Sequence, residues 1–144
     1  MLGGLILAIQ WRDSYAIGIK EIDDQHKQLF DAIDKLFIAC AEGKGKQEVG
    51  NTLLFLEDYT KVHFSDEQQL HIKYNYPERL AHKAVHENFL KHLVKLKQQF
   101  EEEGAGVLFV STVNKTVLEW LIKHIGNLDK AFAAFVKQQE KQSS

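Results

Sequence analysis

The stretch HFSDEQQLHIKYNYPERLAHKAVH, residues 63–86, contains two helical patterns joined by a proline turn. The only proline of the chain, Pro77, follows Asn75 and Tyr76, and a residue that precedes proline is turned away from helical geometry. Proline itself suits the first turn of a following helix. We therefore expect one helix to end near Tyr74 and an antiparallel neighbour to begin at the turn.

The same helical pattern continues outward in both directions. Apolar or histidine positions recur at alternating steps of three and four residues, which marks one face of an α-helix. This pattern predicts four helices, at about residues 23–41, 47–74, 77–103 and 108–138. Short loops separate them, so the expected fold is all-α, an up-down-up-down antiparallel four-helix bundle with an N-terminal arm.

Length and composition limit the organisation of the chain. Its 144 residues, 44% of them hydrophobic, predict a single domain over 1–144, with 1–20 as an arm and 21–138 as the bundle and C-terminal helix. The net charge of −2 comes from mixed acids and bases, which does not favour nucleic acid as a partner. The apolar run 2–9 is too short to span a membrane. A lone cysteine allows no internal disulfide, so we expect a cytoplasmic location.

Several polar side chains occupy helix positions where a bundle would bury leucine or phenylalanine. A buried polar group without a partner costs roughly 1–3 kcal/mol, so partners are required. Metal is the natural partner, because imidazoles and carboxylates are both metal ligands. Alternating helix directions place all of these positions at one end of the bundle. The candidate metal ligands are His26, His63, Glu67, His82, His86, His124 and Asp129.

Seven donors are too many for one ion and suit two. If Glu67 and Asp129 each bridge two metals, with an oxo or hydroxo group as a third bridge, three histidines complete six-coordination on one ion. The other two histidines leave the second ion five-coordinate, with one position where a small diatomic molecule could bind. Ferritin-like sites use more carboxylates, and neutral imidazoles in their place favour reversible binding over oxygen activation.

The spacing of His124 and Asp129 requires a distortion of the fourth helix. Five residues turn a regular α-helix through about 500°, so the two side chains would point roughly 140° apart. We therefore expect the helix to end or distort at Gly126-Asn127, which swings Asp129 back toward the other ligands.

The motifs around these residues resemble the hemerythrin family, in particular its bacterial single-domain members. The resemblance covers about residues 9–138. Gln68 stands where the family commonly has a second glutamate, and His71 where methionine is common. The matching motifs are Gly18-Ile19, Ile22-Asp23-Asp24-Gln25-His26 with Leu29-Phe30, His63-Phe64-x-x-Glu67, Tyr76-Pro77, His82-x-x-x-His86-x-x-Phe89 and Trp120-Leu121-x-x-His124-Ile125-x-x-x-Asp129.

This resemblance implies a non-haem centre of two iron ions, bridged by an oxo or hydroxo group, that binds dioxygen reversibly. It implies that the protein stores oxygen, delivers it to an oxygen-consuming enzyme or senses it. We expect a monomer that is not an enzyme. The alternatives are a di-iron enzyme, such as a peroxidase or a nitric oxide or oxygen reductase, and a sensor that acts through a separate signalling partner. The implied ligands of one iron are His82, His86 and His124, and those of the other iron are His26 and His63. The implied bridging ligands are Glu67 and Asp129.

The sequence also suggests roles for five residues outside the ligand set. Phe30 and Trp120 lie one turn from ligand histidines and could line an oxygen pocket. Ile122 resembles the family's aliphatic gate over the open iron position. His71 follows Glu67 by one turn and is expected to be a partly exposed polar residue, with an extra ligand or a proton relay as alternatives. His92 falls off the apolar face of its helix, so we expect it to be solvated.

Overall fold

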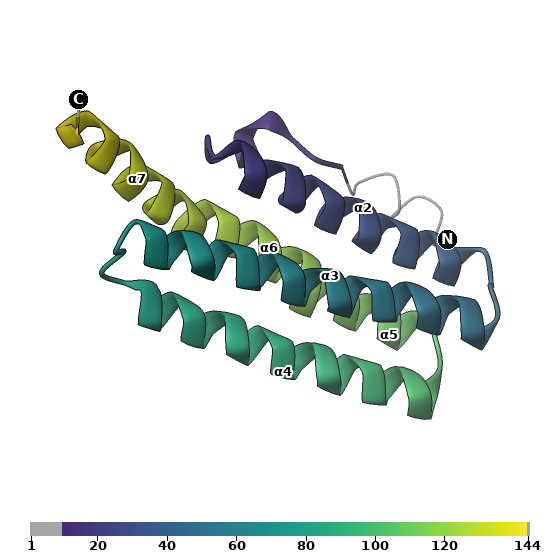
Figure 1. Cartoon of the computed structure of the whole chain (residues 1–144). Coiled ribbons are helices and arrows are strands. Elements are labelled where there is room, and N and C mark those ends of the chain that lie inside the picture. Colours follow the sequence, from purple (N-terminus) through teal and green to yellow (C-terminus); the bar gives the residue numbers. More distant parts are fainter. Residues whose placement is uncertain (1–9, 144) are drawn as a thin grey trace.

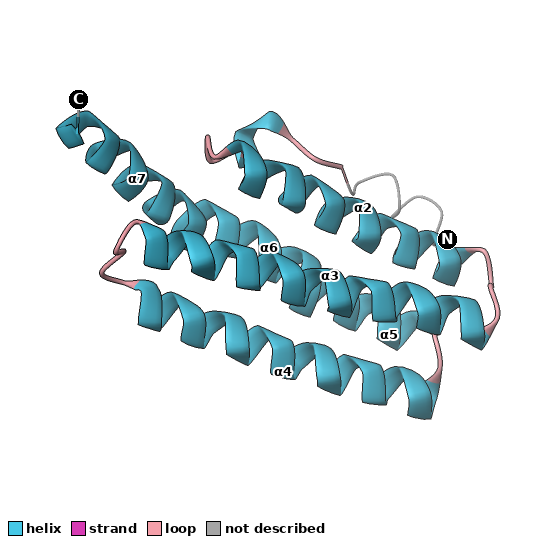
Figure 2. Ribbon diagram, in the orientation of Figure 1, coloured by secondary structure: helices cyan, strands magenta, loops and turns pink. Residues whose placement is uncertain are grey.

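Four antiparallel helical segments pack side by side in the computed structural model, which describes residues 10–143 (Figure 1). Helices and loops make up all of this part of the chain, which contains no strand (Figure 2). The predicted all-α bundle is therefore confirmed. The first three segments are α2 (Lys20–Ala41), α3 (Lys46–Lys73) and α4 (Arg79–Glu103), preceded by a short 3-10 turn, η1 (Asp13–Tyr15). The fourth is a continuous series of α5 (Val107–Val113), η2 (Asn114–Leu118), α6 (Glu119–His124), η3 (Ile125–Asp129) and α7 (Lys130–Ser143).

Residues with a positive φ end two of the helices and form the turn after a third. Gly43 and Gly104 follow α2 and α4 with φ values of 65° and 77°, which glycine adopts without the steric cost that a Cβ would bring. Asn75 has a φ of 56° between α3 and α4. Pro77 lies in this turn, two residues before α4 begins at Arg79, and so precedes the first helical turn in which it was expected.

The fourth segment contains two π-helical turns, η2 and η3, and the spacing of its buried residues explains both. One row of buried residues recurs every four positions, as Phe109, Val113, Val117, Leu121, Ile125, Asp129 and Ala133. Over six such steps a regular α-helix would drift about 240° around its axis. A π turn accommodates one extra residue, which removes about 100° of that drift. Two π turns therefore keep the whole row on the inner face.

The described part of the N-terminal arm is attached to α2. Asp23 Oδ1 accepts a hydrogen bond of 2.8 Å from the backbone N–H of Ile17. The ring of Tyr15 stacks on Phe30, with 5.2 Å between ring centroids. The expectation for the apolar run 2–9 lies outside the described residues.

The bundle core is apolar except toward the end where the chain passes from α3 to α4. Nine polar side chains are buried in the described part, and seven of them are the predicted ligands; the other two are Thr60 and His71. Between residues 10 and 143, no helix is long and apolar enough to cross a membrane.

Candidate metal centre

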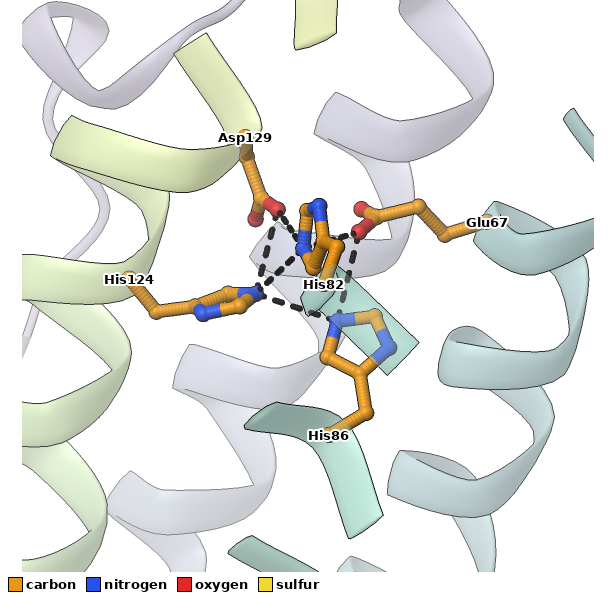
Figure 3. Close-up of side chains that lie close together, drawn as sticks. All are labelled: Glu67, His82, His86, His124 and Asp129. Carbon is orange, nitrogen blue, oxygen red and sulfur yellow. Dashed lines mark hydrogen bonds and ion pairs between the residues drawn. The ribbon is translucent and has the colours of Figure 1, made fainter. Parts of the chain in front are cut away.

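Seven buried donors meet between the four helical segments. None of these residues exposes more than 5% of its surface. Figure 3 shows that five of them point toward one another from α3, α4 and the fourth segment. The structure thus brings together every residue that the sequence analysis selected as a ligand. By element they are His26 on α2, His63 and Glu67 on α3, His82 and His86 on α4, His124 on α6 and Asp129 on η3.

The larger group of donors consists of three histidines and the two carboxylates: His82, His86, His124, Glu67 and Asp129. Nε2 of His124 lies 3.0 Å from Nε2 of His82 and 3.1 Å from Nε2 of His86. Nε2 of His82 also lies 3.0 Å from Glu67 Oε1 and 3.1 Å from Asp129 Oδ1. Two ligands at right angles, each about 2.1 Å from one ion, are about 3.0 Å apart. The measured distances between these atoms therefore match those between neighbouring ligands of one ion.

The smaller group consists of two histidines and the same two carboxylates: His26, His63, Glu67 and Asp129. Nε2 of His26 lies 3.1 Å from Asp129 Oδ2, and Nε2 of His63 lies 3.9 Å from Glu67 Oε2. These are the oxygens that do not face the larger group. Each carboxylate therefore directs one oxygen to each group, which is the arrangement of two carboxylates that bridge two ions.

The π turn η3 gives Asp129 its place in the site. His124 ends α6 and Asp129 ends η3, five residues later. Because a π turn closes five residues on, both side chains lie on the same face, and His124 Nε2 is 3.1 Å from Asp129 Oδ1. The expected distortion at Gly126-Asn127 is confirmed, and the helix continues beyond it as α7.

Most polar atoms of the two groups have no hydrogen-bond partner within the described part of the chain. Each such buried atom costs roughly 1–3 kcal/mol, which a bound cation would offset. Five imidazoles with two carboxylates suit transition metals such as iron, copper, nickel or zinc. The residues therefore fit a pair of such ions. The atoms without a hydrogen bond are both nitrogens of His26, both oxygens of Glu67 and of Asp129, and Nδ1 of His82 and of His124. Nε2 of His26 and the carboxylate oxygens instead lie at ion-pair distance from other atoms of the site.

Charges in the site favour cations. Burial raises the carboxyl pKa of Glu67 and Asp129, but the surrounding imidazoles outweigh burial and hold both pKa values below their usual range. Burial lowers the pKa of His63 to about 3 and also lowers the pKa of His86. Burial opposes protonation of His82 too, yet Asp129 and Glu67 outweigh it and raise the pKa of His82 to about 9. The ionised carboxylates and the neutral imidazoles of His63 and His86 are in the forms that bind metal, whereas His82 has to release its proton on binding.

Two glutamines orient ligand imidazoles from outside the site. Nδ1 of His63 donates to Gln25 Oε1 at 2.7 Å, and Gln25 Nε2 donates to Asp66 Oδ2, also at 2.7 Å. Nε2 of Gln68 donates to Nδ1 of His86 at 3.1 Å. A partner at Nδ1 fixes the ring so that Nε2 faces the metal. The sequence analysis gave neither glutamine this role; the available signal was that each is adjacent to a ligand in sequence.

Aromatic rings and a small apolar cavity adjoin the ligands. Phe64 stacks on His86 with ring centroids 3.8 Å apart, and Trp120 stacks on His124 at 4.5 Å. A cavity of about 10 Å³ lies inside the bundle next to the site. Each of the four helical segments lines it with a residue that is three positions from a ligand in the sequence. Its lining residues are Leu29, Ile33, Leu56, Thr60, Phe64, Phe89, Val117 and Leu121.

The three residues expected at an oxygen pocket lie in different places. Trp120 contacts a ligand imidazole, Phe30 packs on the N-terminal arm, and Ile122 is half-buried on α6. None of the three lines the cavity.

His71 is buried, with 1% of its surface exposed, so the expectation of a partly exposed residue is wrong. The reason lies in the tertiary structure. The ring of Phe132, on α7, packs against the imidazole with 4.3 Å between ring centroids, and the ring of Tyr76 packs against it with 5.2 Å between centroids. Burial lowers the pKa of His71 to about 4, so the imidazole is neutral at pH 7. His92 is exposed, as expected.

Known proteins share both the sequence pattern and the bundle. Residues 17–136 match the family described as "Hemerythrin HHE cation binding domain". The chain is 33% identical over 127 residues to a bacteriohemerythrin of Stenotrophomonas maltophilia, an alignment that covers 88% of this chain and 80% of that protein. It is 36% identical over 110 residues to a bacteriohemerythrin of Methylococcus capsulatus, covering 76% and 82%. A crystal structure of wild-type hemerythrin superposes with a TM-score of 0.77 at 31% identity, over 88% of this chain and 96% of that one.

Proposed function

The chain belongs to the hemerythrin family, and from this premise we propose that it binds dioxygen reversibly at two non-haem iron ions. The three histidines of the larger group hold one iron, and the two of the smaller group hold the other. Glu67 and Asp129 each offer one oxygen to either group and would hold both ions, together with an oxo or hydroxo group. Two ferrous ions would supply the electrons that bound dioxygen takes up.

The unequal division of the histidines is the observation that carries this proposal. Both donor groups share the same two carboxylates, so the groups differ only in their three or two imidazoles. With a shared bridge, the ion of the smaller group would have one protein ligand fewer and would keep one more position open than the ion of the larger group. Structural metal sites are closed by protein ligands, whereas a functional site keeps a position for its ligand. The smaller group, His26 and His63, therefore holds the iron that accepts dioxygen.

The apolar surroundings favour a carrier over an enzyme. Among the described residues, Thr60 is the only polar one that lines the cavity, and its hydroxyl donates to the backbone oxygen of Leu56 at 2.7 Å. A peroxidase or reductase needs an acid that delivers protons to the bound ligand, and a dry, apolar pocket disfavours that step. Exclusion of water also protects bound oxygen from side reactions.

The remaining side chains position the ligands and shield them. Gln25 and Gln68 hold Nδ1 of two ligand imidazoles, which turns Nε2 toward the metal. Phe64 and Trp120 cover the ring faces of His86 and His124. We further propose that the protein acts as a cytoplasmic monomer that stores oxygen, or delivers it to an oxygen-consuming enzyme or a signalling partner.

Oxygen cycling of the iron-loaded protein tests this function. Ferrous iron is added without oxygen, the iron content is measured, and oxygen is then admitted and removed repeatedly while the visible spectrum is recorded. The carrier predicts two irons per chain and an absorption band that appears with oxygen and disappears without it. Irreversible conversion after one exposure would overturn reversible binding and favour an enzyme or a sensor.

A matched pair of histidine variants tests the ligands. His124→Ala removes a buried donor and should lower the iron content, whereas His92→Ala changes an exposed histidine and should leave it at two. Equal iron contents in the two variants would exclude the ligand assignment.

A further inference from the structure

His71 is a buried histidine that neither donor group includes. It lies on α3 one helical turn after Glu67, and neither of its ring nitrogens has a hydrogen-bond partner in the described structure. A neutral imidazole still carries one N–H, and leaving it unpaired in the interior costs roughly 1–3 kcal/mol. An apolar side chain would avoid this cost, so the position calls for a reason specific to the imidazole.

The packing around His71 directs it toward the metal centre. The ring centroids of Phe132, His82 and Tyr76 lie 4.3, 4.6 and 5.2 Å from that of His71, so the imidazole is packed between aromatic rings and a ligand histidine. In this orientation His71 Nε2 is 3.8 Å from Glu67 Oε1.

Oε1 of Glu67 is the oxygen that faces the larger donor group. Nε2 of His82 and Nε2 of His86 lie 3.0 Å and 3.3 Å from it. A carboxylate oxygen has two lone pairs, so Oε1 can bind an ion with one and accept a hydrogen bond with the other. Metal-bound carboxylates are usually hydrogen-bonded in this way. A small rotation of the Glu67 side chain can move Oε1 by about 1 Å. This shift brings the 3.8 Å between His71 Nε2 and Glu67 Oε1 into the range of a hydrogen bond.

We propose that His71 is a positioning residue of the metal centre that donates its Nε2–H to Glu67 Oε1 when metal is bound. This inference rests on the proposed function, because it requires Glu67 to bridge two ions. The hydrogen bond fixes the orientation of the bridge and draws negative charge from the oxygen that faces the three-histidine ion. Less negative charge on a ligand favours the lower oxidation state, so His71 raises the reduction potential and keeps the centre ferrous.

His71→Met tests this role, because it replaces the imidazole with an apolar side chain of similar length. Without metal, the variant should unfold at a higher temperature than the unmodified protein, since an unpaired polar group is removed. Its affinity for ferrous iron should nevertheless fall by about 10-fold, and its reduction potential should shift to a lower value. His71→Gln retains an N–H donor and should recover most of the affinity and the potential.

A role in packing alone gives a different outcome. His71→Met would then lower the unfolding temperature of the metal-free protein, leave the reduction potential unchanged and behave like His71→Gln. Tyr76→Phe is the matched control, because it keeps an aromatic ring against His71 and should leave the potential unchanged. A shift of the potential in the control equal to that of His71→Met would overturn the inference.

Nitrogen NMR of protein loaded with cadmium-113 distinguishes a hydrogen bond from a metal bond. A donor role requires the His71 proton on Nε2, protected from exchange with water, and no spin coupling of that nitrogen to cadmium. Coupling to cadmium would make His71 a ligand and overturn the positioning role. If the unmodified protein takes up fewer than two ions, the proposed function fails as well. If it takes up two and His71→Met is unchanged, only the inference on His71 fails.

Discussion

Deleting Gly126 should keep the metal site and stabilise the protein. The π turn η3 accommodates one extra residue between His124 and Asp129. After the deletion the two ligands are four residues apart, a spacing that places them on one face of a regular α-helix. The residues on either side keep their register, so α7 should pack as before. Gly126 is exposed, and within residues 10–143 a Cβ added there would meet nothing within 4 Å, so no side chain packs over this position.

The gain in stability follows from two local effects. Glycine within a helix costs about 1 kcal/mol relative to a good helix former. Restoring a regular backbone hydrogen bond contributes about 1 kcal/mol more. Together they should raise the unfolding temperature of the metal-free protein by roughly 3–8 °C for a chain of this length. Circular dichroism during heating measures this shift, and metal analysis after iron loading should still find two ions per chain.

Inserting an alanine between Asn127 and Leu128 is the opposite change. It turns Asp129 about 100° further around the helix axis. With a carboxylate about 5 Å from that axis, the oxygens move by about 8 Å, and metal bonds of about 2.1 Å cannot follow them. The insertion should therefore lower the metal content. If the deletion variant stays folded but loses metal like the insertion variant, the explanation of η3 is refuted.

Three further predictions concern the surroundings of the ligands. Gln25→Leu removes the partner of His63 Nδ1 and should weaken binding of one ion by about 10–100-fold in a competition titration against a chelator, with the other ion retained. Without metal, His82 holds a proton up to its pKa of about 9, so metal binding below that pH displaces it. Metal affinity should therefore rise between pH 7 and pH 8, and calorimetry in two buffers should detect proton release; an affinity independent of pH would contradict this. Leu56→Ala should lower the free energy of unfolding by about 3 kcal/mol in a denaturant titration. Because it admits water to the cavity, it should also shorten the lifetime of the oxygenated protein. Leu54→Ala, at an exposed position on the same helix, is the control for both measurements.

The pattern of apolar and polar residues was sufficient to predict the helices and the candidate ligands. Side chains of one helix that lie three, four or seven residues apart share a face, so a donor such as His86 at a core position must point inward. Antiparallel helices then bring donors from distant parts of the chain to one depth. The spacing of His124 and Asp129 also predicted the distortion of the fourth helix, because helical geometry depends only on residue number.

The contacts between helices could not be predicted from the sequence and are known only from the tertiary structure. The rotation of each helix about its axis decides which oxygen of Glu67 faces which donor group, and that Gln25 rather than another residue reaches His63. His71 was expected to be partly exposed because its own helix extends toward the end of the bundle; α7, more than fifty residues later in the chain, covers it. Periodicity within a helix thus determined which residues point inward, and packing between helices decided what each of them meets there.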